Sequence, residues 1–189
     1  MDIGTGDGRF VYQSARENPE KFYLGIDANR KPLAKISMKA TRQAAQGGAA
    51  NVLFIQAAVE DLPNELNGVA DEIHIHFPWG SLLRAVATGD PQVLGGLRRT
   101  MVPGGLLEVV IGVDPERDRG EIERLQLPPV SLDHINSVLG PRYAACGLEI
   151  KEKGYLAAGE WPHLQSSWAR RLRGNNQRQV VYLIAAARK

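Results

Sequence analysis

Short apolar runs alternate with amphipathic segments along this chain. Runs typical of buried strands cover residues 22–27, 51–58, 72–77, 106–113, 148–155 and 179–187. Segments with the composition or spacing of helices separate most of these runs. They cover 10–18, 30–46, the stretch from the end of the 72–77 strand to about Thr100, and a region near 131–146. Glycines at 47–48 end one predicted helix, and "PGG" at 103–105 predicts a turn before the next strand.

This alternation predicts an α/β fold, with a parallel sheet that carries helices on both faces. No clear full-length helix separates the last two strands, so we expect the seven-stranded sheet to close with an antiparallel strand. The length predicts a single domain over residues 1–189. The connection at about 156–178 is long for a compact domain, and such segments often carry function.

The chain begins unusually, with "MDIGTGDGR". A glycine loop at residues 4–8 follows only Met1, Asp2 and Ile3, so most of the strand expected before it is missing. We therefore expect the full protein to have an N-terminal segment upstream of Met1.

Composition narrows the class of protein. Hydrophobic residues make up 43% and charged residues 23% of the chain, which is ordinary for a globular protein. The longest apolar run, 106–113, is far shorter than the ~20 residues of a membrane helix. No secretion signal opens the chain, and a lone Cys146 excludes a disulfide framework. We expect a cytoplasmic protein without membrane contact.

The glycine loop "DIGTGDG" is the first candidate site. Gly4, Gly6 and Gly8 would let the backbone approach a ligand closely, just before a helix begins. The spacing is not the G-x-G-x-x-G of dinucleotide-binding proteins, and Asp2 and Asp7 would repel a pyrophosphate. Asp27, which ends the apolar run at 22–27, is placed to bind ribose hydroxyls. The alternative is a plain strand-to-helix turn.

The sequence resembles the Rossmann-like class I methyltransferases that use S-adenosylmethionine (SAM). "DIGTGDG" is similar to their first motif and "GIDAN" to their second. The resemblance implies that the loop lies under the methionine part of SAM and that Asp27 binds the ribose. "AAVEDLP" then implies adenine contacts from Ala58, Val59 and Glu60.

Phe77-Pro78-Trp79 stands where many base-amine methyltransferases carry an acid or amide, two prolines and an aromatic residue. Here the stacking ring and a proline remain, but phenylalanine replaces the side chain that would accept amine hydrogens. A ring nitrogen with an in-plane lone pair needs no such acceptor. Trp168 in "SSWARRLRGNNQR" offers a second face, and two rings can sandwich an extruded base. The alternative for Trp168 is a core side chain.

Two segments are strongly basic, although the net charge is only +2. Residues 160–189 carry six Lys or Arg against one acid, and residues 30–46 carry five with none. Such a local excess of positive charge suggests contacts with phosphates. The alternative is that these side chains lie on solvated helix surfaces.

The combination of "DIGTGDGR", "FPWGSLLR" and "SSWARRL" resembles the aminoglycoside-resistance 16S rRNA adenine-N1 methyltransferases, the kanamycin–apramycin resistance family. The resemblance runs over nearly all of the chain. It implies methylation of N1 of the decoding-site adenine in helix 44 of 16S rRNA, within the 30S ribosomal subunit, by a cytoplasmic enzyme that we expect to be a monomer. Members carry a segment ahead of the first motif that is proposed to help docking, and we expect it upstream of Met1.

The resemblance also implies a role for individual residues. SAM would be lined by Asp2, Gly4, Thr5, Gly6, Asp27, Ala58, Val59, Glu60, His76 and Ser81. The flipped adenine would be positioned by Phe77, Pro78, Trp79 and Trp168. The RNA would meet Lys35, Lys39, Arg42, Ser166, Arg170, Arg171, Arg173 and Arg178.

The expected reaction is direct in-line transfer, because adenine N1 carries no proton to remove and the sulfonium methyl is already activated. No general base is therefore assigned. We interpret His74, His76, His134 and His163 as structural, since no metal-binding spacing links them, and expect no metal. Two alternatives stay open: another RNA methyltransferase, such as a tRNA guanine-N7 enzyme, and a SAM-binding module without catalysis.

Overall fold

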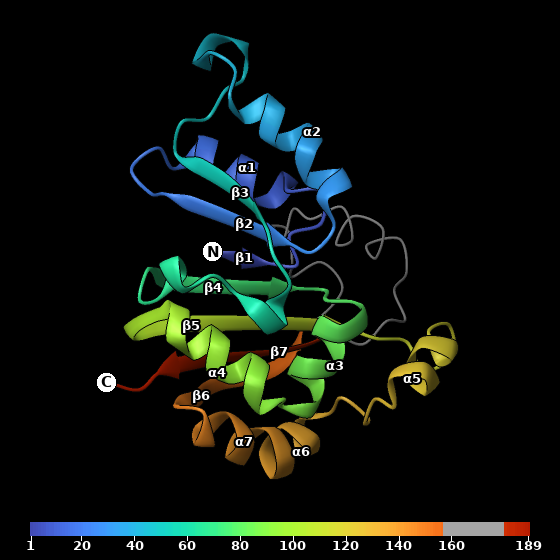
Figure 1. Cartoon of the computed structure of the whole chain (residues 1–189). Helices are drawn as coiled ribbons and strands as arrows, with labels where there is room; N and C mark the ends of the chain where they lie inside the picture. The colour runs from blue at the N-terminus through green and yellow to red at the C-terminus, as the bar shows by residue number, and fades with distance from the viewer. Residues whose placement is uncertain (157–179) are drawn as a thin grey trace.

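The computed structural model describes residues 1–156 and 180–189, which build one sheet with helices on its faces (Figure 1). The strands are β1 (Asp2–Ile3), β2 (Tyr23–Asp27), β3 (Val52–Gln56), β4 (Ala70–His76), β5 (Met101–Gly112), β6 (Leu148–Leu156) and β7 (Val180–Ala187). The α-helices are α1 (Arg9–Glu17), α2 (Arg30–Ala40), α3 (Gly80–Thr88), α4 (Pro91–Thr100), α5 (Arg119–Leu125), α6 (Leu132–His134) and α7 (Gly140–Ala145). None of these described helices is long and apolar enough to cross a bilayer.

The seven strands lie in the order β3-β2-β1-β4-β5-β7-β6. Neighbours from β3 to β5 run parallel, whereas β7 lies between β5 and β6 and is antiparallel to both. The expected mostly parallel sheet with a final antiparallel strand is therefore confirmed. This is the topology of the Rossmann-like class I methyltransferase fold.

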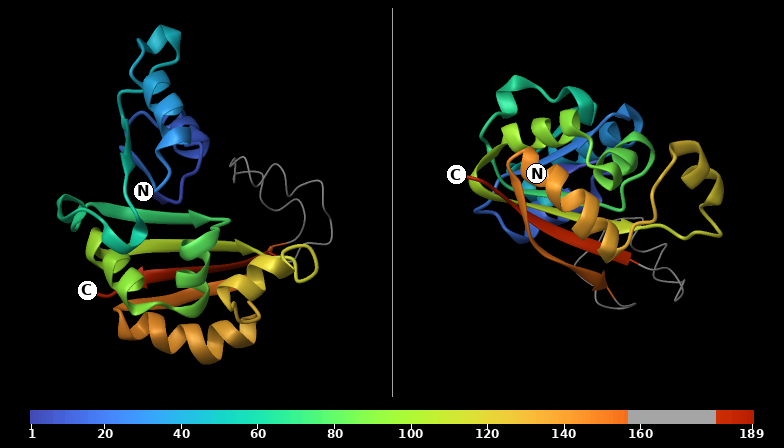
Figure 2. Two further views of the ribbon diagram at one scale, coloured as in Figure 1. Left: turned by 45° about the vertical axis from the view of Figure 1, so that its right-hand side comes forward. Right: turned by 90° about the horizontal axis from the view of Figure 1, so that it is seen from below.

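Two apolar clusters hold the helices to the sheet. The main core joins the sheet to α3, α4 and α7, which gather on one side of it (Figure 2), and it includes the fully buried Leu83, Leu94 and Tyr143. A second cluster packs α1 and α2 against β2 and β3, with Tyr12 and Ile36 among its members. Helices therefore cover both faces of the sheet.

The alternation along β4 assigns its side chains to opposite faces. Ile73 and Ile75 are fully buried in the main core. Because side chains alternate along a strand, His74 and His76 point to the other face, where the ring of Phe10 from α1 contacts both imidazoles. This face also carries the carboxylate of Glu108 from β5.

Two predicted boundaries were wrong. "PGG" makes no separate turn, because β5 already begins at Met101 and absorbs these residues in an irregular stretch where the register with β4 shifts. Gly104, with φ +83, supplies the backbone freedom for it. The predicted 30–46 helix ends at Ala40, and residues 44–46 form a separate 3₁₀ turn.

The charged loop after β5 contains a helix that the apolar pattern did not indicate. Helix α5 is short and mostly exposed, and ion pairs from Arg119 to Glu123 and from Arg124 to Glu121 run along it. The predicted 131–146 helix is interrupted by a π-helical turn, Ile135–Leu139, directly before Gly140 and Pro141. Proline has no N–H to donate, which disturbs a regular α-helix there.

Candidate active site

A pocket of about 450 Å³ opens at the carboxyl ends of β1, β2 and β4. The chain reverses its direction across the sheet between β1 and β4, and this switch point is where open α/β sheets bind ligands. The volume is within the usual range of small-molecule sites. The lining comes from the glycine loop, the end of β2, the turn after β3 and the segment from His76 to Leu82.

The glycine loop lines this pocket with Gly4, Thr5 and Gly6. The N–H groups of Gly4 and Thr5 both donate to the carbonyl of Ile26, at 2.8 and 3.0 Å. Gly4 has φ +75, and a Cβ at this position would lie 2.6 Å from the side chain of Leu82. Gly6 also has a positive φ, +58, but its surroundings are open, so its backbone remains accessible to a ligand.

Asp27 ties the loop to the end of β2. Its Oδ2 accepts a hydrogen bond from the N–H of Gly6 at 2.8 Å, and its Oδ1 accepts one from the N–H of Asn29 at 2.8 Å. Each oxygen keeps a further lone pair that can accept from a ligand hydroxyl. The carboxylate is thus held at the pocket wall in a fixed orientation.

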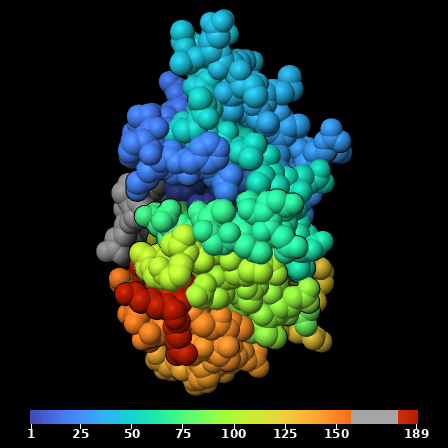
Figure 3. Space-filling view, turned by 60° about the vertical axis from the view of Figure 1, so that its left-hand side comes forward, coloured from blue at the N-terminus to red at the C-terminus, as the bar shows by residue number. Residues whose placement is uncertain are grey.

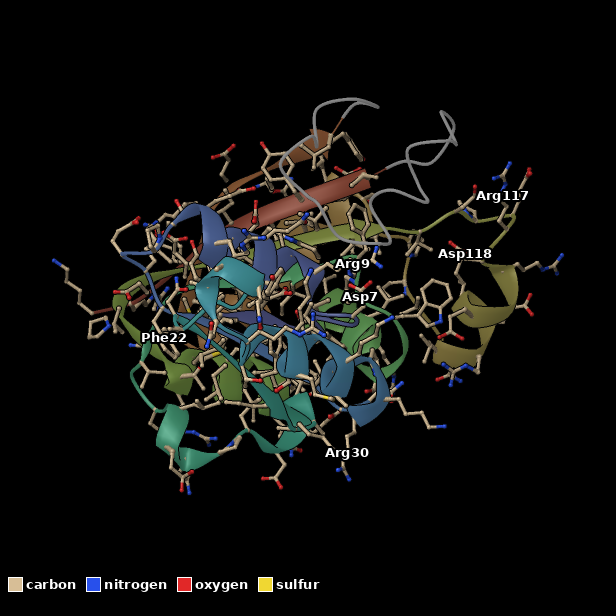
Figure 4. The ribbon with its side chains drawn as sticks, turned by 90° about the horizontal axis from the view of Figure 1, so that it is seen from above. Asp7, Arg9, Phe22, Arg30, Arg117 and Asp118 are labelled. Carbon is tan, nitrogen blue, oxygen red and sulfur yellow. The ribbon has the colours of Figure 1, made fainter. Side chains whose placement is uncertain are left out.

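Asp2 is the buried acid of the site, with 6% of its surface exposed. Burial raises the pKa of its carboxyl, and the nearby His76 opposes that shift. Asp7 of the same loop lies outside the pocket, side by side with Arg9 where α1 begins (Figure 4), and pairs with it at 3.3 Å. The two acids of the loop therefore occupy different environments.

Nine of the ten residues predicted to line the cofactor lie in the pocket wall: Asp2, Gly4, Thr5, Gly6, Asp27, Val59, Glu60, His76 and Ser81. Ala58 does not line it, because the chain turns at this residue into the 3₁₀ turn Val59–Asp61, and Ala57 takes its place. Sequence reasoning missed Ala57, Phe10 and Asn29, which also line the pocket. Only Asn29 had a local signal, as an N-cap residue of the predicted helix.

Phe77 redirects the chain at the end of β4. Its φ of +50 is a left-handed conformation that is uncommon for an aromatic residue, while its N–H still donates to Val110. Its ring is buried against Val110 and Val180, so it anchors the turn. Strained backbone of this kind costs about 1–3 kcal/mol and clusters at functional sites.

The turn presents Pro78 and Trp79 to the pocket. Trp79 stands immediately before α3, and 42% of its surface is exposed, which is much for so large an apolar side chain. Its predicted partner Trp168 lies outside the described residues. The same holds for Ser166, Arg170, Arg171, Arg173, Arg178 and His163.

The three described residues predicted to contact RNA lie together. Lys35, Lys39 and Arg42 line a groove between α1 and α2, and Arg9 and Lys31 join them there. The ammonium of Lys39 lies 4.5 Å from the centroid of the Tyr12 ring. Sequence reasoning missed Arg9, because its contribution depends on how α1 packs beside α2.

Two of the histidines interpreted as structural meet at one carboxylate. His74 Nδ1 and His76 Nε2 each lie 2.8 Å from Oε2 of Glu108. Burial opposes ionisation of Glu108, but the hydrogen bonds from both histidines outweigh it and hold its pKa far below the usual range. Sequence reasoning did not single out Glu108; the alternating "HIH" of the predicted strand was the available signal.

Comparisons with known proteins identify the family of the chain. The model of the NpmA family, described as 16S rRNA (adenine(1408)-N(1))-methyltransferase, matches residues 1–187. A 16S rRNA (adenine(1408)-N(1))-methyltransferase of Streptoalloteichus tenebrarius is 37% identical over 178 residues, which cover 94% of this chain and 81% of the relative.

Solved structures give the same result. The aminoglycoside resistance methyltransferase NpmB1 is 44% identical, with a TM-score of 0.85 over 98% of this chain and 85% of its own. A W203A mutant of the 16S rRNA (adenine(1408)-N(1))-methyltransferase from Catenulisporales acidiphilia, solved with its cosubstrate SAM, is 35% identical, with a TM-score of 0.90 over 100% of this chain and 84% of its own. This chain belongs to the NpmA family of 16S rRNA (adenine(1408)-N(1))-methyltransferases.

Proposed function

We propose that this protein methylates N1 of the decoding-site adenine in helix 44 of 16S rRNA, within the assembled 30S subunit, and thereby protects ribosomes from aminoglycosides. As a member of its family it is a SAM-dependent methyltransferase. The observation that carries the proposal is Trp79, a large exposed ring that lines the pocket at the carboxyl ends of the strands.

The described residues fit SAM. The open backbone of Gly6 suits the close approach of the methionine part, and the fixed carboxylate of Asp27 suits two neighbouring ribose hydroxyls. Val59, Glu60, His76 and Ser81 also line the pocket, and the adenine of SAM would lie against Val59 and Glu60. SAM supplies a methyl group that is already activated by the sulfonium charge.

The proposed role of the protein in the transfer is to position the base. Trp79 and Trp168 would stack on the two faces of the flipped adenine, each stack contributing about 1–3 kcal/mol. The Pro78 backbone would lie near the edge of the base. The N1–methyl bond forms as the sulfur–methyl bond breaks, and the positive charge passes from sulfur to the purine ring. N1 has no proton to lose, so the step uses no general base and no metal.

The groove between α1 and α2, which is lined by basic side chains, supports docking on ribosomal RNA. Lys35, Lys39 and Arg42, with Arg9 and Lys31, bring several cations to one surface between α1 and α2. Such clusters bind phosphates without reading base sequence. Ser166, Arg170, Arg171, Arg173 and Arg178 belong to the same proposal, in the 156–178 segment. We further propose that the enzyme acts as a monomer in the cytoplasm.

The identity of the methylated nucleoside tests the proposal. The protein is incubated with purified 30S subunits and SAM carrying a labelled methyl group, and the 16S rRNA is then digested to nucleosides and separated by chromatography. We expect label in 1-methyladenosine. A Trp79→Ala variant should lose most of this label, whereas Trp79→Phe, which keeps a stacking ring, should retain much of it.

Two results would contradict the proposal. Label in 7-methylguanosine, with tRNA preferred over 30S subunits, would assign the chain to the tRNA guanine-N7 class. A folded protein that binds SAM in calorimetry but transfers no label to either RNA would be a binding module without catalysis.

A further inference from the structure

His74, His76 and Glu108 form a side-chain cluster on the face of the sheet that carries α1. His74 and His76 are two positions apart on β4, so both point to the same face, and Glu108 on β5 stands directly opposite His74. One atom from each residue, two imidazole nitrogens and a carboxylate oxygen, lies within 4.8 Å of the other two. Of the three, only His76 also lines the cofactor pocket, whereas His74 and Glu108 lie outside its lining.

The chemistry of these three groups matches a transition-metal site. Two neutral imidazoles and one carboxylate are a common set of three protein ligands for Zn²⁺, with water in the remaining position. Two histidines at alternate positions of one strand, with an acid on the next strand, bring such ligands together without distorting the backbone. The backbone pairing of β4 with β5 fixes their spacing.

The environment holds the ligands in place. The side chain of His76 is only 3% exposed, and those of His74 and Glu108 are 26% exposed. The Phe10 ring packs edge-on against both imidazoles, with centroid distances of 5.8 and 5.1 Å. Ligands that are fixed before an ion arrives lose little conformational entropy on binding it.

His76 also has an unused polar atom. Its Nδ1 is buried and has no hydrogen-bond partner among the described residues. Metal-binding histidines commonly use the second ring nitrogen to interact with a carboxylate, which orients the ring. The buried Asp2, which pairs in register with His74 on β1, interacts electrostatically with His76 and is the carboxylate available for this role.

An ion can reach the cluster from solvent. A cavity of about 520 Å³, lined by Met1, Phe10, Glu72 and His74 among others, opens beside it. Figure 3 shows the surface hollowed between the residues near 20 and those near 70, with the first residues of the chain at its base. A carboxylate oxygen of Glu72 lies 3.6 Å from Nε2 of His74, which adds negative charge at this entrance.

We propose that His74, His76 and Glu108 bind one divalent transition-metal ion of the zinc type. The ion replaces the two hydrogen bonds that now join the histidines to Glu108 and braces β4 against β5. Since His76 directly precedes Phe77, the brace supports the turn that presents Trp79. The role is structural, and methyl transfer does not use the ion.

Metal titration of the full chain, with any affinity tag removed and bound metal stripped by a chelator, tests this site. Co²⁺ is the probe, because its visible absorption reports coordination by nitrogen and oxygen at low coordination number. We expect one Co²⁺ per chain, displaced by one Zn²⁺, and a higher melting temperature with Zn²⁺. Glu108→Gln keeps an acceptor for the histidines but removes the anionic ligand, and should weaken binding about tenfold or more.

His134→Gln is the matched control for this titration, and His74→Gln is a second variant of the cluster. His134→Gln removes a histidine of α6 that is not part of the cluster and whose Nε2 bonds to the carbonyl of Ala87 in α3, and it should leave Co²⁺ binding unchanged. His74→Gln, at a half-buried position, replaces Glu108→Gln if the latter fails to fold by circular dichroism. Binding that is absent, or that is lost equally in His134→Gln, would overturn the site and leave a hydrogen-bonded network alone.

Discussion

At the scale of single residues, Asp27 connects the two halves of the proposed cofactor site. Its two oxygens already accept hydrogen bonds from Gly6 and Asn29, so the carboxylate does not have to be ordered when SAM binds. The same acid therefore shapes the glycine loop and offers acceptors to the ligand. A substitution there should affect SAM binding through both effects.

The substitution Asp27→Asn tests this double role. The amide loses the charge and can accept from only one of the two N–H groups, and hydrogen bonds to charged groups contribute about 1.5–3 kcal/mol. We expect SAM to bind roughly tenfold or more weakly in isothermal titration calorimetry. Asp7→Asn is the matched control, because Asp7 is an acid of the same loop that lies outside the pocket and pairs with Arg9.

Equal affinities of Asp27→Asn and wild type would remove Asp27 from the cofactor site. A parallel loss in Asp7→Asn would mean that loop charge in general, and not the Asp27 carboxylate, determines binding.

Local motifs explain which site residues could be predicted. Asp27 and Trp79 follow strand ends that the apolar pattern marks, whereas Gly4 and Gly6 belong to a glycine motif that can be recognised without the strand before it. Glu108 could not be found in this way. It meets His76 across 32 positions of sequence because of the register between β4 and β5, and no local pattern encodes that register.

At the scale of elements, the glycine loop and α1 are held against β2 and β3 by close packing. Gly8, the N-cap of α1, has φ +67, and an added Cβ would lie 2.6 Å from the ring of Phe54 and 2.8 Å from Ile36. Gly6 has a similar φ, +58, but nothing within 4 Å of an added Cβ. A comparison of the two positions therefore separates the cost of left-handed backbone strain from the cost of a side-chain clash.

Alanine substitutions at these two positions should differ in their effect on the free energy of unfolding. Gly6→Ala adds only left-handed strain, which costs about 1–2 kcal/mol. Gly8→Ala adds a clash in a packed cluster, worth about 1–3 kcal/mol more. Urea unfolding followed by circular dichroism measures both. Equal destabilisation of the two variants would show that Phe54 and Ile36 yield without cost.

Most elements could be predicted, and the exceptions share a physical cause. Strands and helices with a strong apolar period lie where expected, with boundaries shifted by a few residues. Helix α5 was missed because much of it is exposed and its ion pairs, such as Arg119 with Glu123, leave little apolar signal. The start of β5 was missed because Gly104 and Gly105 lie in a strand bulge, where glycines usually indicate a turn.

At the scale of the whole molecule, the order of the strands brings the site together. The reversal between β1 and β4 places the glycine loop beside the turn at Phe77, although these segments are about seventy residues apart in the chain. The sequence shows no clear full-length helical pattern between the last two strands, and this predicted an antiparallel end to the sheet. It did not predict that β7 would insert between β5 and β6, because partner choice depends on the whole sheet.

The position of the methyl group on ribosomal RNA tests the central claim most directly. Purified 30S subunits are incubated with SAM and the wild-type protein, Trp79→Phe or Trp79→Ala, and reverse-transcriptase stops are mapped along the 16S rRNA. A methyl at N1 blocks the pairing edge of adenine. We therefore predict a single new stop at the decoding-site adenine, weakened about 5- to 150-fold in Trp79→Ala, as loss of one stack requires. A stop elsewhere in the 16S rRNA, or full methylation by Trp79→Ala, would contradict the account.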